Sequence, residues 1–318
     1  MTAKRIFITG ASGCIGHYIV DALIQQTSHE LFLLVRNPDR FKLDPEARPG
    51  IHLLQGDMYQ IEQFGSLLKT MDRVILTAAA WGGAQETYDV NVTKTIRLLN
   101  LLDPEICEQV IYFSTASILD RHNQPLKEAG QLGTDYIRSK VTCHQRLGKL
   151  AIAPQITTVF PTLVFGGDAT KPLSHITAGL PNVLRWMGLI RFFRLEGSFH
   201  YIHGHDIAQV VVHLLEHPPA PEDSRELVLG NPAITADAAI AEMVHYLNQR
   251  IYFRLPLTPA LTNLFIRIFR IQMAAWDYFC LTYRHFTHQN PVNPATYGGV
   301  PFCSSLSDIL KVSGVPPR

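Results

Sequence analysis

The sequence predicts an α/β fold, in which a doubly wound parallel β-sheet carries helices on both faces and a smaller C-terminal region follows. Two observations predict this class. Strand-like apolar runs alternate with helix-like amphipathic runs through the first half of the 318 residues, as in consecutive βαβ units. A turn that contains Gly10, Gly13 and Gly16 joins the first strand-like run to the first helix-like run.

The expected elements follow from hydrophobic periodicity. Short continuous apolar runs are typical of strands buried on both faces, and they predict strands at 5–9, 31–35, 51–54, 73–77, 109–114 and 156–160. Apolar residues three and four apart predict helices at 14–26, 61–69, 85–102 and 136–150. Prolines and glycines break the pattern after residue 160. Beyond them we expect a helix that ends near residue 216, a strand at 226–229 and a helix at 235–248.

The glycine turn has the spacing of a nucleotide-phosphate cradle. Its glycines permit a sharp turn, close approach of the backbone to a pyrophosphate, and close packing of the helix on the strand. The helix N-terminus then presents free N–H groups to the phosphates. A glycine-rich turn without a ligand is the alternative, which fits this strand–turn–helix context less well. The context favours a Rossmann-like dinucleotide site with contacts from Gly10, Ser12, Gly13, Cys14, Ile15 and Gly16.

Arg36 stands at the end of the second expected strand, about 20 positions beyond the last glycine, where an acid normally meets the ribose 2′-hydroxyl. An arginine there can pair with a 2′-phosphate. The sequence therefore favours NADP over NAD, although an ordinary solvated arginine is the alternative.

Two further loops follow strands at the same edge of the expected sheet. Asp57 and Met58 follow the third strand, where a loop can reach the adenine side of the cofactor. Ala78, Ala79 and Ala80 follow the fourth strand, and their small side chains let the backbone approach the cofactor closely. A simple tight-packing turn is the alternative for the alanines.

Tyr136 and Lys140 are four residues apart, which places them on the same side of a helix. A nearby ammonium, together with a positive nicotinamide, favours the phenolate and lowers the pKa of the phenol from its usual value of about 10. The phenol can then act as acid or base on a substrate oxygen, and Lys140 can also hydrogen-bond the cofactor ribose. The pair follows a strand that ends in the hydroxyl-rich segment 114–117.

Composition argues against several other classes. The formal net charge is +1 with Lys and Arg scattered, so we expect no nucleic-acid partner. There are 5 cysteines and no CxxC pair, a usage that suits a reducing cytosol. The first strand begins so early that we expect no signal peptide and a cytoplasmic location.

Three histidines lie close together in sequence at His200, His203 and His205. One face of a strand could present the last two but not all three, so we expect no metal site. We expect the neighbouring Asp206 to be the N-cap of the following helix.

The most apolar stretch, 255–283, contains Arg267, Arg270 and Asp277 and is therefore not an uninterrupted membrane span. We expect a helix packed into the second region. Its aromatic residues, with those of 180–193, predict a pocket for a hydrophobic small molecule such as a sterol-like, terpenoid, phenolic or tetrapyrrole-like compound. A protein core, a homodimer face, and a membrane-surface contact (which we do not favour) are the alternatives. The residues concerned are Phe253, Phe265, Phe269, Trp276, Phe279, Leu184, Trp186, Met187, Ile190 and Phe192.

Taken together, these motifs resemble the short-chain dehydrogenase/reductase superfamily in its extended or atypical branch, which is related to the epimerases and dehydratases. The similarity covers nearly the whole chain. It is carried by the segments 9–16, 78–80, 91–92, 114–117, 136–140, 161–166 and 201–208. The resemblance implies a Rossmann-like fold, NAD(P), a Ser/Thr-Tyr-Lys catalytic set and a small C-terminal substrate domain. It adds to the expected cofactor contacts Asn91, Ser114, Pro161, Thr162, Leu163 and Val164, with Tyr136 and Lys140.

Two positions depart from the family pattern. The catalytic hydroxyl aligns with either Thr115 or Ala116, so Thr115 and Ser117 are both candidates. Phe160 stands where many sugar-nucleotide enzymes carry an arginine, which weakens the expectation of a sugar-nucleotide substrate.

We therefore expect residues 1–160 to bind NAD(P) and residues 161–318 to bind mainly substrate, with 201–230 returning to the first domain. The expected activity is that of an NADP-dependent oxidoreductase that moves a hydride between nicotinamide and a secondary alcohol or ketone. Tyr136 is its expected acid/base, and Lys140 is expected to lower the pKa of the Tyr136 phenol. Thr115 or Ser117 is expected to donate a hydrogen bond to the substrate carbonyl. An epimerase or dehydratase that recycles its nicotinamide, and a non-catalytic NADP-binding regulatory or assembly protein, are the alternatives.

Overall fold

A parallel seven-stranded sheet forms the centre of the fold. The computed structural model describes residues 3–220, 222–268 and 272–317, and in this part of the chain the strand order is β11-β6-β5-β4-β1-β2-β3. The strands are β1 (Arg5–Thr9), β2 (Glu30–Val35), β3 (Ile51–Gln55), β4 (Arg73–Leu76), β5 (Gln109–Phe113), β6 (Ile156–Pro161) and β11 (Glu226–Leu229). Every strand expected before residue 161 is present with ends that agree within one residue. The predicted doubly wound, Rossmann-like class is confirmed.

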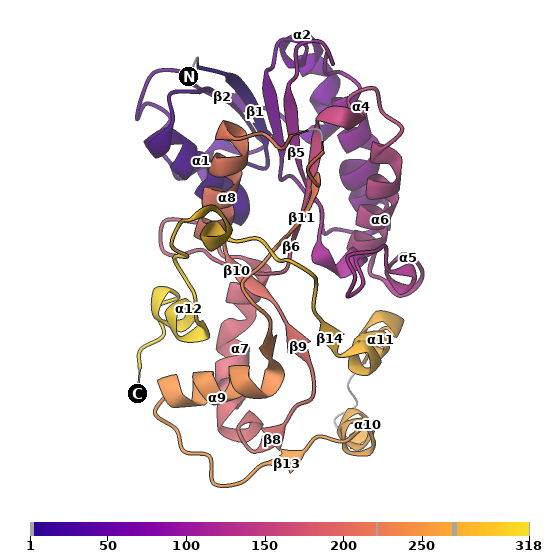
Figure 1. Ribbon diagram of the computed structural model, residues 1–318, viewed down its shortest axis with the longest axis vertical. Coiled ribbons are helices and arrows are strands. Elements are labelled where there is room, and N and C mark those ends of the chain that lie inside the picture. The colour runs from indigo at the N-terminus through magenta and orange to yellow at the C-terminus, as the bar shows by residue number, and fades with distance from the viewer. Residues whose placement is uncertain (1–2, 221, 269–271, 318) are drawn as a thin grey trace.

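Helices cover both faces of this sheet (Figure 1). On one face lie α1 (Cys14–Gln26) and α8 (Gly204–Glu216), and on the other lie α2 (Gly65–Leu68), α4 (Thr95–Leu99) and α6 (Asp135–Leu147). Successive residues of β1 point to opposite faces. Ile6 and Ile8 pack in the cluster with α1 and α8, whereas Phe7 packs in the cluster that includes Leu98 and Leu147.

Two expected helices are divided. Instead of one helix at 85–102, the chain forms α3 (Ala84–Tyr88), a π-helical turn at Asp89–Lys94, and then α4. The Thr95 hydroxyl donates to the Val90 carbonyl at 2.9 Å within that turn. Instead of one helix at 61–69, a 3₁₀ segment at Met58–Phe64 precedes α2, because the Asp57 carboxylate caps it by accepting from the Tyr59 amide.

The residues after β6 build most of the lower half of the molecule (Figure 1). Small sheets there pair β7 with β10, β8 with β13, and β9 with both β12 and β14. These strands are β7 (Leu163–Phe165), β8 (Phe193–Arg194), β9 (Ser198–Phe199), β10 (Tyr201–His203), β12 (Ile234–Thr235), β13 (Leu255–Pro256) and β14 (His285–Phe286). The helices of this region are α7 (His175–Ile190), α9 (Ala236–Tyr246), α10 (Pro259–Ile268), α11 (Ala275–Tyr283) and α12 (Leu306–Val312). The short helix α5 (Lys127–Leu132) precedes β6 in the chain and packs against α6.

The apolar stretch 255–283 is not a single helix. It comprises β13, α10 and α11, and Ala274 before α11 has extended backbone. Among the described helices, none is long and apolar enough to cross a membrane.

The expectation that its aromatic residues line a pocket is wrong for those the structure describes. Trp276 and Phe279 pack in the cluster that contains Phe160. Leu184, Met187 and Ile190 pack against α9, and Phe192 stacks on Phe253 with ring centroids 5.0 Å apart. Trp186 is exposed. Phe269 and the side chain of Phe265 lie outside the described residues. Apolar side chains from separate elements bury one another here, so most of these residues belong to the protein core and do not line a pocket.

Asp206 is not the N-cap of α8. That cap is His203, whose Nδ1 accepts from the His205 amide at 3.2 Å. The Asp206 carboxylate is fully buried and instead accepts from the amides of Phe302 (2.6 Å) and Cys303 (3.3 Å), and so ties the C-terminal segment to α8. In the described part of the chain, no group of three or more His, Cys, Asp or Glu side chains is arranged to hold a metal ion.

Candidate functional site

A cavity of about 840 Å³ opens at the carboxyl edge of the sheet, above the neighbouring strands β1 and β4, where the strand order of the sheet reverses. In doubly wound sheets ligands bind at this switch point. Of the cofactor-binding and catalytic residues expected from the sequence, all but one line it. They are Gly10, Ser12, Gly13, Cys14, Ile15, Gly16, Arg36, Asp57, Met58, Ala78, Ala79, Ala80, Ser114, Thr115, Ser117, Tyr136, Lys140, Pro161, Thr162, Leu163 and Val164.

Asn91 is the exception, because it lies behind the cavity wall. Its side-chain amide accepts from the Ala80 amide (2.8 Å) and donates to both the Ala80 carbonyl and the Ser139 hydroxyl (3.0 Å each). Asn91 therefore holds the alanine loop against α6 and shapes the wall without facing the cavity.

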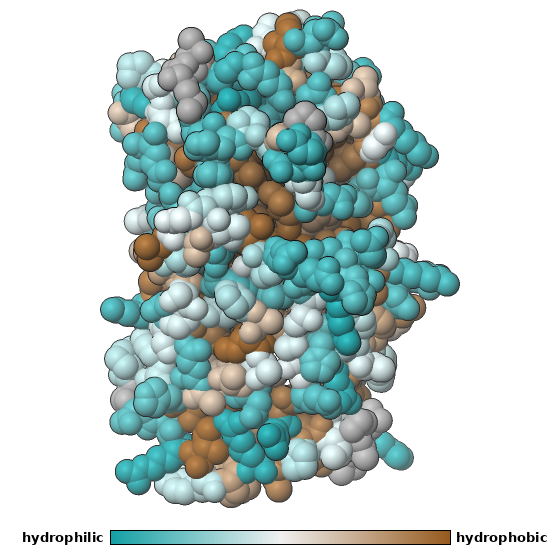
Figure 2. All heavy atoms as spheres, in the orientation of Figure 1, coloured by the Kyte–Doolittle hydropathy of each residue, from teal (hydrophilic) through white to brown (hydrophobic). Residues whose placement is uncertain are grey.

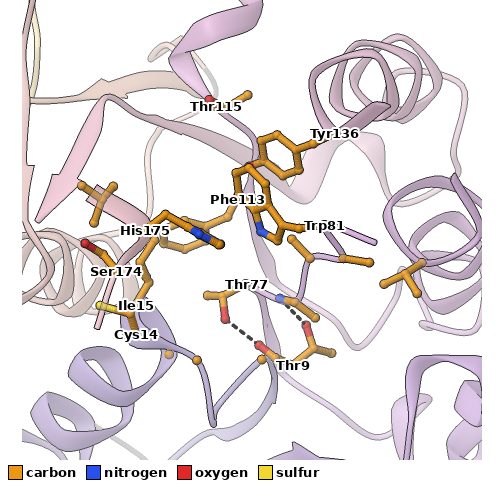
Figure 3. Close-up of a pocket in the computed structure, with 18 of the residues that line it drawn as sticks. Thr9, Cys14, Ile15, Thr77, Trp81, Phe113, Thr115, Tyr136, Ser174 and His175 are labelled. Atoms are coloured by element: carbon orange, nitrogen blue, oxygen red, sulfur yellow. Dashed lines mark hydrogen bonds between the residues drawn. The ribbon is translucent and has the colours of Figure 1, made fainter. Parts of the chain in front are cut away.

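The glycine turn forms the floor of the cavity. Gly10 has φ +75°, and a Cβ there would come within 2.6 Å of the Ala78 amide nitrogen. A Cβ at Gly16 would lie 2.1 Å from the Gly10 carbonyl oxygen. The neighbouring loop is held close by Thr77, whose hydroxyl donates to the Thr9 carbonyl at 2.7 Å (Figure 3). Only glycine fits such close contacts between β1, β4 and α1.

The start of α1 suits an anion. The helix has Gly13 as its N-cap, and no side chain among the described residues caps it, so its first N–H groups face the cavity without such a partner. Burial raises the pKa of the neighbouring Cys14 thiol to about 12, so it adds no negative charge at neutral pH. The Ser114 hydroxyl is buried, lines the cavity and has no hydrogen-bond partner among the described residues. These features fit a dinucleotide.

A second, smaller cavity of about 210 Å³ adjoins the first beside Arg36. It is lined by Ser12, Arg36, Asn37 and Arg40. Arg36 is 70% exposed and lies 3.8 Å from the Asp57 carboxylate. Two guanidinium groups around one small hollow can hold an anion such as a phosphate monoester. Arg40 was not singled out in the sequence, and it lies four residues beyond Arg36 at the end of the 3₁₀ turn Pro38–Arg40.

Tyr136 and Lys140 come from the first turns of α6, which begins after the N-cap Thr134. The Lys140 ammonium is buried, donates to the Phe113 carbonyl at 2.7 Å, and lies 5.8 Å from the centroid of the Tyr136 ring. Burial lowers the pKa of Lys140 to about 8. Burial also raises the pKa of the Tyr136 phenol. Desolvation accounts for this rise, and the Lys140 ammonium, which donates to the Phe113 carbonyl, does not lower the pKa of the phenol here. The expected lowering by Lys140 together with a positive nicotinamide stays a prediction.

Thr115 and Ser117 both face the cavity, on the loop after β5. The Thr115 hydroxyl donates to the Ser117 hydroxyl at 3.3 Å and caps the short helix that follows by accepting from the Ser117 amide. Ala116, between them, points into the core. The structure therefore keeps both hydroxyls as candidates.

Two aromatic side chains at the site were missed in the sequence. Trp81 stacks on Tyr136 with ring centroids 3.7 Å apart, and its other neighbour is His175 at 4.6 Å. Figure 3 shows the three side by side above Thr9 and Thr77. The position of Trp81, directly after the alanines 78–80, was the one available signal, whereas His175 is brought in by tertiary folding.

The fold and this site define a member of the short-chain dehydrogenase/reductase superfamily, in its extended branch. The chain belongs to the NAD dependent epimerase/dehydratase family, whose sequence profile matches residues 6–230.

Several known proteins are similar to parts or all of the chain. The structure of Gox2253 superposes with a TM-score of 0.70 and 18% identity, covering 98% of this chain and 99% of that one. The dTDP-glucose 4,6-dehydratase of Bacillus anthracis, in complex with NAD, has a TM-score of 0.66 and 14% identity, covering 98% and 96%. An isoflavone reductase homolog of Nicotiana tabacum is 36% identical over 100 residues, which are 30% of this chain and 31% of that relative. The match therefore spans about a third of the relative's length.

Proposed function

We propose that the protein is an NADP-dependent oxidoreductase that transfers a hydride between nicotinamide and a secondary alcohol or ketone carbon. The observation that carries this proposal is the position of Tyr136 and Lys140, on one side of α6 and in the same cavity as the glycine turn. Residues 1–160, with 201–230, would hold the cofactor, and the rest of the chain would hold mainly substrate.

Each residue has a distinct part in the proposed reaction. A bound nicotinamide would supply or accept the hydride. The Tyr136 hydroxyl exchanges a proton with the substrate oxygen, and Thr115 or Ser117 donates a hydrogen bond to the same oxygen. Lys140 stabilises the phenolate and hydrogen-bonds the ribose. Because burial raises the pKa of Tyr136 in the free protein, the positive charge of an oxidised nicotinamide would contribute to lowering it.

The choice of NADP rests on the cavity beside Arg36. The guanidinium groups of Arg36 and Arg40 would pair with the 2′-phosphate. The Ser12 hydroxyl and the Asn37 side chain would add hydrogen bonds. The Asp57 carboxylate lies 3.8 Å from the Arg36 guanidinium and neutralises part of its charge. Because this pairing weakens the attraction of Arg36 for a 2′-phosphate, NAD is the alternative cofactor.

A hydrophobic substrate is supported by the residues at the cavity mouth, which replace those expected from the sequence. Trp81, Leu163, Leu173 and Ile176 line the cavity and are all more than a third exposed. Burial of their apolar surface by a ligand would contribute roughly 25 cal/mol per Å². The name of the tobacco relative, an isoflavone reductase homolog, supports a phenolic ring compound among the candidates.

The test is the Tyr136→Phe variant, assayed for NADPH consumption over a panel of apolar ketones. Loss of the acid/base should lower turnover by roughly 10²–10⁴-fold, while NADPH binding persists. Tyr278→Phe, an exposed tyrosine on α11, is the matched control and should retain full activity. Near-full turnover of Tyr136→Phe would exclude the mechanism.

A second candidate is an epimerase or dehydratase that recycles a tightly held nicotinamide, which the family description favours. Cofactor that copurifies in stoichiometric amount, with substrate turnover and without net oxidation or reduction, would select this candidate. Hydride transfer to any ketone on the panel would exclude the third candidate, a non-catalytic NADP-binding regulatory or assembly role.

A further inference from the structure

The end of the molecule farthest from the main sheet exposes large apolar side chains. The last turns of α7 expose Trp186 (58%) and Leu189 (52%). The segment before β13 exposes Tyr252 (74%) and Phe253, and β13 exposes Leu255. We call these residues the tip surface. In Figure 1 the strands β8 and β13 lie at this lower end, and Figure 2 shows hydrophobic and hydrophilic side chains mixed there.

The tip surface is one continuous structure. Leu255 pairs with Phe193 in the β8–β13 ladder, and Phe192 stacks on Phe253 at 5.0 Å. The Arg191 guanidinium bridges the two segments by donating to the Arg250 carbonyl at 3.0 Å. Phe253 and Leu255 are therefore held in place by ring and backbone contacts.

Within the two chain segments that carry these residues, all charged side chains are arginines. The segments 180–195 and 249–268 contain arginines at 185, 191, 194, 250, 254 and 267, and neither segment contains an acid or a lysine. The acid Glu196, directly after the first segment, is paired with Arg284. Arg254 is paired with Asp237 at 2.6 Å. Arg185, Arg194 and Arg250 are exposed and make no ion pair with any described residue. Apolar surface and uncompensated positive charge thus occupy the same end of the fold.

We propose that the tip surface docks the protein peripherally on an anionic lipid bilayer. Indole and phenol rings favour the headgroup level, and arginines beside them can pair with lipid phosphates and carboxylates. Buried apolar area and electrostatic attraction together set the strength of such interfacial binding. A second copy of this chain fits less well, because a twofold contact would bring like-charged arginines together in an apolar interface.

The test is sedimentation of the 318-residue chain with vesicles of phosphatidylcholine, with or without phosphatidylserine, at low and high salt. Binding should require phosphatidylserine and weaken as salt rises. The double variant R185Q/R194Q should bind roughly 30-fold more weakly, and R185E/R194E should bind more weakly still. Trp186→Ser should weaken binding through lost apolar contact, with the salt dependence retained.

Two controls separate docking from general charge and folding effects. K69E/K149E makes the same charge change at exposed positions around the main sheet and should bind like the wild type. Circular dichroism should show that every variant is folded. Equal binding to both vesicle types, or unchanged binding of R185E/R194E, would overturn the proposal. A dimer in light scattering that becomes a monomer with Trp186→Ser, without vesicle binding, would overturn it in favour of a subunit interface.

Discussion

The indole ring of Trp81 lies flat against the phenol ring of Tyr136, with ring centroids 3.7 Å apart and ring planes 12° from parallel. Trp81 is 55% exposed, so it forms a wall between solvent and one face of the proposed acid/base. Both side chains line the cavity, so a substrate oxygen at the Tyr136 hydroxyl would share that cavity with the indole. The pair therefore links the chemistry of α6 to the shape of the cavity mouth.

We predict that Trp81→Ala raises KM for apolar substrates by roughly 3- to 10-fold, the equivalent of one aromatic contact. Trp81→Phe should retain most of the wild-type affinity because it keeps a ring against Tyr136. The dissociation constant of NADPH, measured by its fluorescence, should stay unchanged in both variants. An unaltered KM in Trp81→Ala would show that substrate does not contact the indole.

Cofactor choice is predicted to depend on Arg36. The wild type should bind NADPH more tightly than NADH, and Arg36→Asp should weaken NADPH by roughly 10- to 100-fold, the value of a charge-assisted hydrogen bond. NADH binding should be unaffected or improved. Lys69→Asp makes the same change of charge at an exposed position directly after α2, and it is the control. Equal or tighter NADH binding by the wild type in calorimetric titration would contradict the role given to Arg36.

Lys140 predicts a pH dependence of stability. Its pKa is lowered by burial to about 8 in the folded chain, against a usual 10.5. The charged amine thus disfavours the folded state, and this cost is fully present below pH 8 and falls as the pH rises through 8 toward 10.5.

Lys140→Met removes that cost, which corresponds to roughly 3 kcal/mol, and loses the hydrogen bond to Phe113, about 1 kcal/mol. We therefore predict that the variant is more stable than the wild type at neutral pH and that the difference shrinks between pH 8 and 10.5. Urea unfolding across this window measures it, with the exposed Lys149→Met as control. A constant difference would refute the titration of Lys140. The same variant should lose most of its activity.

We predict that the Asp206 carboxylate contributes strongly to holding the C-terminal segment against α8. Asp206→Ala leaves the buried amides of Phe302 and Cys303 without their acceptor and should lower the free energy of unfolding by roughly 2–4 kcal/mol. Asp206→Asn keeps one carbonyl oxygen and should cost less. Glu222→Ala, at an exposed position, should have little effect. If urea unfolding gave Asp206→Ala and Glu222→Ala the same free energy of unfolding, the prediction would be contradicted.

The sequence by itself determined the strands of the main sheet and most of the cavity lining. Both are encoded locally, because a buried parallel strand needs a continuous apolar run and a phosphate cradle needs glycines at fixed spacing. Parallel strands bring their carboxyl ends to one edge, so residues as distant as Gly13, Ala79 and Tyr136 could be assigned to one place before any contact was known.

Only the tertiary structure decided the side chains that complete the site and the fate of the apolar C-terminal residues. Trp276 and Met187 have the same hydrophobic character as residues of a binding pocket, and only their burial against Phe160 and α9 distinguishes core from cavity. Asp206 has the sequence context of a helix cap, yet the approach of residues 302–303 gives its carboxylate other donors. The pKa of Tyr136 likewise depends on desolvation by distant segments, which sequence spacing does not encode.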